Sequence, residues 1–118
     1  MTRLFKLLTF QAATLATTGL MLSTAAAITR AAPMPAAASV QIANFTFKAQ
    51  VVTVKPGTTV TWTNADDIPH TVTSNNGLFK SKVLDSGDHF SFTFAKPGQF
   101  GYFCSLHPHM TGTIVVKA

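Results

Sequence analysis

Two segments of the chain alternate strictly between large apolar side chains and hydroxyl side chains. In residues 58–63 (TTVTWT), Val60 and Trp62 fall on one side of an extended backbone. The side chains of Thr59, Thr61 and Thr63 fall on the other side. In residues 89–94 (HFSFTF), three phenylalanines alternate with Ser91 and Thr93 in the same way. Because a β-strand directs successive side chains to opposite faces, both segments are predicted to be half-buried strands.

Weaker extended patterns occupy much of the remaining C-terminal part of the chain, with turn signals between them. Two Pro-Gly pairs, at residues 56–57 and 97–98, predict tight turns, and residues 104–110 are expected to form a loop. No 3.6-residue period occurs in this part, so an all-β sandwich or barrel is predicted. Further strands are expected at residues 40–47, 51–55, 70–74, 99–104 and 112–117.

The first 27 residues have the three parts of a secretory signal. Arg3 and Lys6 supply a positive start, residues 7–22 are largely apolar, and residues 25–27 (AAA) provide a small-x-small cleavage site. The sequence lacks a twin arginine, which favours the general secretory route. An uncleaved N-terminal anchor is the alternative, although the apolar run is short and rich in threonine for a membrane span of about 20 residues.

Residues 28–38 are rich in alanine and proline, with Pro33 and Pro35 among them. Such a composition cannot bury a core and predicts a linker, although cleavage after Ala38 would also fit the signal pattern. The folded domain is therefore predicted to span residues 39–118. A domain of this size buries a modest core and often needs a metal or a disulfide for support.

The charge balance excludes some partners. The formal net charge is +5, and it falls to +3 without Arg3 and Lys6 and to +2 without Arg30 as well. A mildly basic domain without a run of Lys or Arg does not indicate nucleic-acid binding. The adjacent Asp66 and Asp67 are expected to be solvated loop residues rather than acid–base catalysts.

The candidate chemistry lies in residues 104–110 (CSLHPHM), which have the spacing C-x2-H-x2-M. Cys104 is the single cysteine of a chain predicted to be exported, where an unpaired thiol indicates either intermolecular pairing or a special role. A thiolate, the imidazole of His107 and the thioether of Met110 are donors for a soft metal. With His70 as a second imidazole, they form the two-His, one-Cys set with axial Met of a mononuclear blue copper site.

The same residues also allow other interpretations. Zinc can bind a Cys/His2 set, but structural zinc sites usually take four Cys or His ligands, and methionine is a poor partner for zinc. Cys104 could also be a small buried hydrophobe in a metal-free interaction module. The two spare histidines, His89 and His109, are expected at the surface and at the rim of the site.

The paired motifs at residues 67–72 (DIPHTV) and 101–110 (GYFCSLHPHM) resemble those of the cupredoxins, and within that family most resemble the amicyanins. The resemblance covers essentially the whole predicted domain. It implies a Greek-key β-sandwich with one copper ion at one end, held by His70, Cys104, His107 and Met110. It also implies an apolar docking patch around the second histidine, to which Pro69, Pro108, Leu106 and loop residues near Gly77 would contribute.

Two positions depart from the pattern that this resemblance implies. Family members commonly have asparagine after the first histidine ligand, where its side chain ties the two ligand loops together, whereas this chain has Thr71. The shorter hydroxyl leaves that tie open, and we expect a small effect on the redox potential rather than loss of copper. His109 stands where a bulkier apolar residue is expected, and a titrating histidine there would make partner binding pH-dependent.

These observations predict a periplasmic blue copper protein that transfers single electrons and is not an enzyme, because a closed four-ligand site leaves no open position for substrate. A monomer without stable membrane insertion after signal cleavage is expected. The resemblance implies a dehydrogenase as electron donor and a c-type cytochrome or an oxidase as acceptor. The alternative is a periplasmic carrier or scavenger of Cu(I), for which the same ligands would serve.

Overall fold

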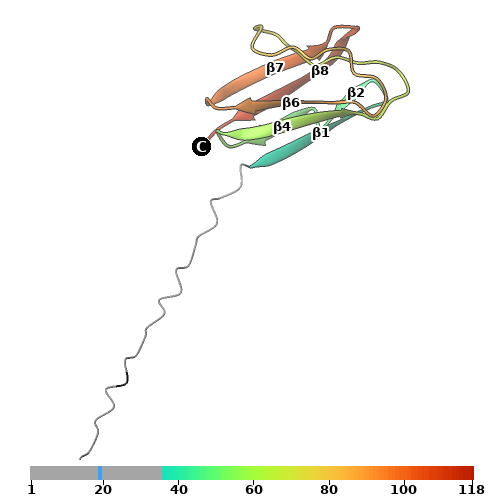
Figure 1. The fold of residues 1–118 in the computed structure, drawn as a ribbon. Helices are drawn as coiled ribbons and strands as arrows, with labels where there is room; N and C mark the ends of the chain where they lie inside the picture. The colour runs from blue at the N-terminus through green and yellow to red at the C-terminus, as the bar shows by residue number, and fades with distance from the viewer. Residues whose placement is uncertain (1–18, 20–35) are drawn as a thin grey trace, which may run out of the picture. The chain divides into compact units, whose positions relative to one another are not determined.

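The computed structural model describes Gly19 and residues 36–118, and the latter form two stacked β-sheets (Figure 1). The first sheet has the strand order β2 (Thr46–Lys48), β1 (Ala37–Ala43), β4 (Thr58–Asn64), β6 (His89–Phe94). The second has the order β3 (Val51–Val54), β8 (His107–Val116), β7 (Gly98–Cys104), β5 (Thr73–Ser74). The described part contains no helix, so the predicted all-β sandwich is confirmed.

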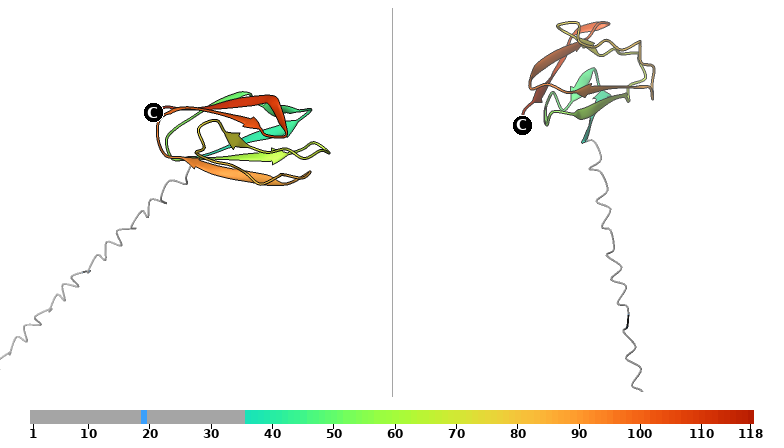
Figure 2. Two further views of the ribbon diagram at one scale, coloured as in Figure 1. Left: turned by 90° about the horizontal axis from the view of Figure 1, so that it is seen from above. Right: turned by 60° about the vertical axis from the view of Figure 1, so that its left-hand side comes forward.

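Each sheet contains one pair of parallel strands. β1 pairs in parallel with β4, and β3 pairs in parallel with β8. β7 is antiparallel to β8 and ends where β8 begins, so Cys104 and His107 lie at one end of the sandwich and Ala118 at the other. Figure 2 shows the loops gathered at the two ends of the stacked sheets.

The predicted alternation of β4 and β6 is confirmed in detail. Trp62 and Val60 are fully buried and lie opposite Phe90 and Phe92. On the other face, cross-strand hydroxyl pairs link the two strands, with Thr59 Oγ1 2.7 Å from Thr93 Oγ1. Such pairs stabilise a solvent-facing sheet surface without apolar contact.

An aromatic cluster forms the centre of the core. The Trp62 ring centroid lies 5.3 Å from that of Tyr102, 5.7 Å from Phe79 and 6.3 Å from Phe94. Tyr102 comes from the second sheet, so its ring joins the two layers edge-on against Trp62. Aromatic side chains bury large areas, and this packing contributes much of the apolar burial of a small domain.

Three predicted boundaries were wrong. The strand expected over residues 40–47 is a hairpin, because residues 44 and 45 both have positive φ and reverse the chain between β1 and β2. β1 begins at Ala37, inside the predicted linker, because its alanines pair in the sheet through backbone groups alone. The strand expected over residues 70–74 shrinks to β5, with His70 joined to Leu84 by an isolated bridge.

The last strand also differs from the prediction. β8 begins at His107 rather than at residue 112, so the expected loop of residues 104–110 reduces to a two-residue turn. Cys104 pairs directly with His107 across this turn, with a register shift after Phe103. The motif is therefore a β-hairpin, and backbone pairing holds its Cys and His side by side.

The predicted signal of residues 1–27 and all but the last residues of the predicted linker lie outside the described part, apart from Gly19. Among the residues that the structure describes, none belongs to a helix long and apolar enough to cross a membrane.

Gly112 provides a test of the core packing. It lies opposite Tyr102 in the β7–β8 ladder, and a Cβ atom at this position would overlap the Tyr102 ring. We expect Gly112→Ala to lower the free energy of unfolding by about 1–3 kcal/mol, because the ring must leave its packed position. Urea denaturation measures this change, and Thr111→Ala, at the exposed neighbouring position, serves as control. Equal midpoints for the two variants would contradict the packing argument.

Candidate metal centre

The candidate site lies at the end of the sandwich where β7 ends and β8 begins. Cys104 is the last residue of β7 and is fully buried. Its Sγ atom lies 3.6 Å from Nδ1 of His107 across the hairpin turn. A two-residue turn keeps the thiol and the His107 imidazole together because both belong to the same backbone ladder.

His70 reaches the same point from the loop that follows β4. It is fully buried, and its Nδ1 lies 3.7 Å from Cys104 Sγ. Two backbone hydrogen bonds with Leu84 fix its position, at 3.0 Å from His70 N to Leu84 O and at 2.8 Å in the reverse direction. The buried Asn64 supports this loop by donating from Nδ2 to the carbonyls of Ile68 and Leu84.

The structure thus brings together three of the four predicted site residues. The candidate ligand atoms of His70, Cys104 and His107 all lie within 4.8 Å of one another. Met110 follows on β8 and is buried, with 5% of its surface exposed. One thiol and two imidazole nitrogens that converge in a buried site fit the donor preference of copper.

The spare histidines lie outside this cluster. His89 and His109 are both exposed, and neither belongs to the group of converging donors found among the described residues. Their exposure agrees with the prediction that neither is a ligand at the buried site.

The Thr71 side chain links the loop that carries His70 to the hairpin that carries Cys104 and His107. The sequence alone did not establish this link. Its Oγ1 accepts a hydrogen bond from Ser105 N at 2.7 Å and lies 2.7 Å from Ser105 Oγ. Its backbone N–H donates to Cys104 Sγ at 3.3 Å. This contact and the Ser105 bonds hold the sulfur and the hairpin turn against the loop that carries His70.

The far side of the His70 ring contacts a carboxylate. His70 Nε2 lies 2.7 Å from Asp66 Oδ2, and the same carboxylate accepts the backbone N–H groups of Asn44 and Phe45. Burial raises the pKa of Asp66, but these hydrogen bonds outweigh burial and hold that pKa below its ordinary value. The expectation that Asp66 is merely solvated was therefore wrong, although its spacing of four residues from His70 was visible in the sequence.

Phe45 is a second residue that the sequence analysis missed. Its ring lies edge-on against both imidazoles, with centroid distances of 5.7 Å to His70 and 5.1 Å to His107. The side chain is 54% exposed, so it forms part of the molecular surface beside the site. No local signal marks this contact, because Phe45 is distant from both histidines in the chain.

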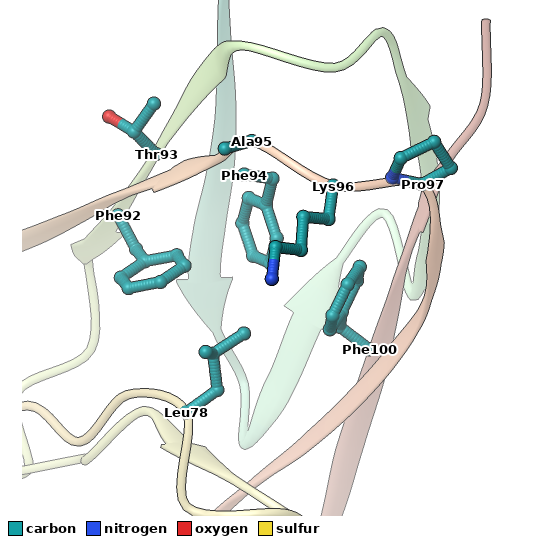
Figure 3. Close-up of a pocket in the computed structure, with 8 residues that line it drawn as sticks. All are labelled: Leu78, Phe92, Thr93, Phe94, Ala95, Lys96, Pro97 and Phe100. Carbon is teal, nitrogen blue, oxygen red and sulfur yellow. The ribbon is translucent and has the colours of Figure 1, made fainter.

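None of these residues lines the pocket drawn in Figure 3. It has a volume of about 350 Å³ and apolar walls that include Phe92, Phe94 and Phe100. Pro97, which also lines it, precedes β7, whereas Cys104 ends that strand. At about 3.4 Å per residue, the strand separates Pro97 from Cys104 by about 24 Å.

The Thr71 hydroxyl can be tested without metal. We expect Thr71→Val to lower the free energy of unfolding of the metal-free chain by about 1 kcal/mol, because the Ser105 N–H loses its acceptor. Thr71→Ser keeps the hydroxyl and serves as the matched control. Chemical denaturation measures both variants, and a Val variant as stable as the Ser variant would show that the tie between the loops is unimportant.

Comparisons with known proteins agree with this geometry. A family model described as a cupredoxin-like domain matches residues 11–116. Amicyanin-alpha of Methylorubrum extorquens is 37% identical over 83 residues, which cover 66% of this chain and 70% of that protein.

Solved structures show the same likeness. A purple cupredoxin from Nitrosopumilus maritimus is 35% identical with a TM-score of 0.64, and the match covers 68% of this chain and 99% of that one. An amicyanin variant solved with Cu(I) is 32% identical with a TM-score of 0.66, covering 69% of this chain and 82% of that one. The predicted resemblance is confirmed, and the chain belongs to the cupredoxin-like family.

Proposed function

We propose that this protein is a one-electron carrier in which His70, Cys104, His107 and Met110 hold a single copper ion. The observation that carries the proposal is the convergence of one thiol and two imidazole nitrogens within 4.8 Å at a buried end of the sandwich. When bound in such a site, copper supplies a Cu(II)/Cu(I) couple. The matched amicyanins include oxidised and reduced structures, which supports this role.

The residues around the donors are suited to a carrier. Cys104 and His107 belong to one hairpin, and backbone bonds to Leu84 fix His70, so all three are positioned by the fold itself. Donors held in this way move little between two oxidation states, which keeps the reorganisation small.

His107 provides the exit for the electron. It is partly exposed, whereas His70 and Cys104 are fully buried. Exposed apolar side chains lie near it in sequence or in space, with Leu106 46% and Phe45 54% exposed. We infer that a redox partner docks on this end, where Pro69 and Pro108 are also exposed. A dehydrogenase donor and a c-type cytochrome or oxidase acceptor are the proposed partners.

The proposed location is the periplasm, reached through the general secretory route. The signal pattern of residues 1–27 supports export, and the relatives named amicyanin support an electron carrier. The protein is proposed to act as a monomer and to catalyse no reaction by itself.

A visible absorption titration tests the copper site. We expect Cu(II) added to the purified chain to produce an intense blue band that saturates at about one copper per chain, because the band arises from charge transfer between the Cys104 thiolate and Cu(II) in a blue copper site. Cys104→Ala is expected to abolish the band. A band that persists in this variant, or no band in the parent, would overturn the proposed site.

Redox cycling separates the electron carrier from a Cu(I) carrier. We expect repeated reduction and reoxidation of the loaded protein to restore the full band each time, even with a Cu(I) chelator present, because a buried four-donor site retains both oxidation states. Stepwise loss of the band with transfer of copper to the chelator would instead favour the carrier or scavenger.

A further inference from the structure

The Asp66 carboxylate is bonded to groups of the protein, unlike a loop carboxylate that only water solvates. Its Oδ2 lies 2.7 Å from His70 Nε2 and accepts the Phe45 N–H at 3.0 Å, while its Oδ1 accepts the Asn44 N–H at 2.6 Å. Its own backbone N–H donates to Asn64 Oδ1 at 2.9 Å. The carboxylate is therefore held from both sides, and 14% of the side chain is exposed.

This contact determines which nitrogen of His70 carries the proton. An ionised carboxylate can only accept hydrogen bonds, so the ring nitrogen that faces it must be the donor. With the proton on Nε2, Nδ1 is bare and its lone pair faces Cys104 Sγ, 3.7 Å away. A carboxylate on the remote nitrogen also makes the imidazole a more basic ligand.

The same carboxylate stabilises a turn whose backbone conformation is unfavourable. Asn44 and Phe45 connect β1 and β2 as a two-residue turn with φ values of 52° and 55°. Asparagine tolerates this left-handed region, but an aromatic residue rarely adopts it. Both N–H groups of the turn donate to Asp66, and the turn directs the Phe45 ring against both imidazoles.

We propose that Asp66 is a positioning residue that couples the His70 imidazole to the Phe45 turn, fixes Nδ1 as the metal-facing nitrogen and lowers the reduction potential of the bound ion. The potential falls because an anionic group behind the ligand stabilises the more highly charged oxidation state. The inference rests on the proposed copper site, and its first test needs no metal.

The first experiment is NMR of the metal-free chain and of Asp66→Asn, with Asp67→Asn as the matched control at an exposed neighbouring carboxylate. In the parent and the control, we expect two-bond proton–nitrogen spectra to show His70 protonated on Nε2. The amide of Asp66→Asn can donate to Nε2, so this variant is expected to shift His70 towards protonation on Nδ1. The amide protons of Asn44 and Phe45 are expected to move upfield in the same variant only.

The second experiment measures the copper-loaded proteins by voltammetry and by Cu(II) competition. We expect Asp66→Asn to have a higher reduction potential than the parent and a Cu(II) dissociation constant raised about tenfold or more. Asp67→Asn, which lacks contact with His70, is expected to match the parent. Far-UV circular dichroism and unchanged core resonances verify that the variants remain folded.

The outcomes separate the two proposals. If the parent forms a blue site but Asp66→Asn keeps the Nε2-protonated tautomer and the parent potential, the role of Asp66 is overturned while the copper site stands. If the parent binds no copper but the tautomer shifts as expected, the proposed function fails while the Asp66–His70 coupling stands. An equal change in Asp67→Asn would reduce the effect to general surface charge and also overturn the inference.

Discussion

The site depends on one constraint: a fully buried imidazole needs a partner for each of its two ring nitrogens. His70 is fully buried, with Asp66 at one nitrogen and Cys104 at the other. An unpaired polar atom in such a place would cost free energy, so the contacts at both nitrogens fix the ring in position and orientation. The surrounding contacts of Thr71, Asn64 and Leu84 all position this loop relative to the hairpin.

The two-sheet fold meets this constraint through strand direction. The loop after β4 and the hairpin between β7 and β8 come from different sheets, yet both lie at one end of the sandwich. The packing of Trp62 against Tyr102 joins the layers below them. Because this aromatic core is rigid, the distance between the two ligand segments is set by the fold rather than by their own flexibility.

The buried donors and the partly exposed donor of the site have different surroundings. His70 and Cys104 are buried and bonded to backbone and side-chain partners, whereas His107 is partly exposed beside Leu106. A buried donor set resists rearrangement, and a partly exposed ligand gives a partner access to the same centre. A carrier of electrons needs both properties.

The sequence by itself determined the strands with strict alternation, the all-β class and the nearness of Cys104 to His107, because period-two patterns and short ligand spacings are local. His70 lies 34 residues from Cys104, so its approach to these donors depends on the fold. It did not show that residues 44–45 reverse the chain, since a phenylalanine with positive φ is unfavourable without the Asp66 carboxylate. It also misjudged the residue 104–110 segment, which pairs as a hairpin once β7 and β8 align. Tertiary structure alone decided the Thr71–Ser105 tie, the place of Phe45 over both imidazoles and the role of Asp66 toward His70, because these contacts depend on how distant loops meet at one end of the sandwich.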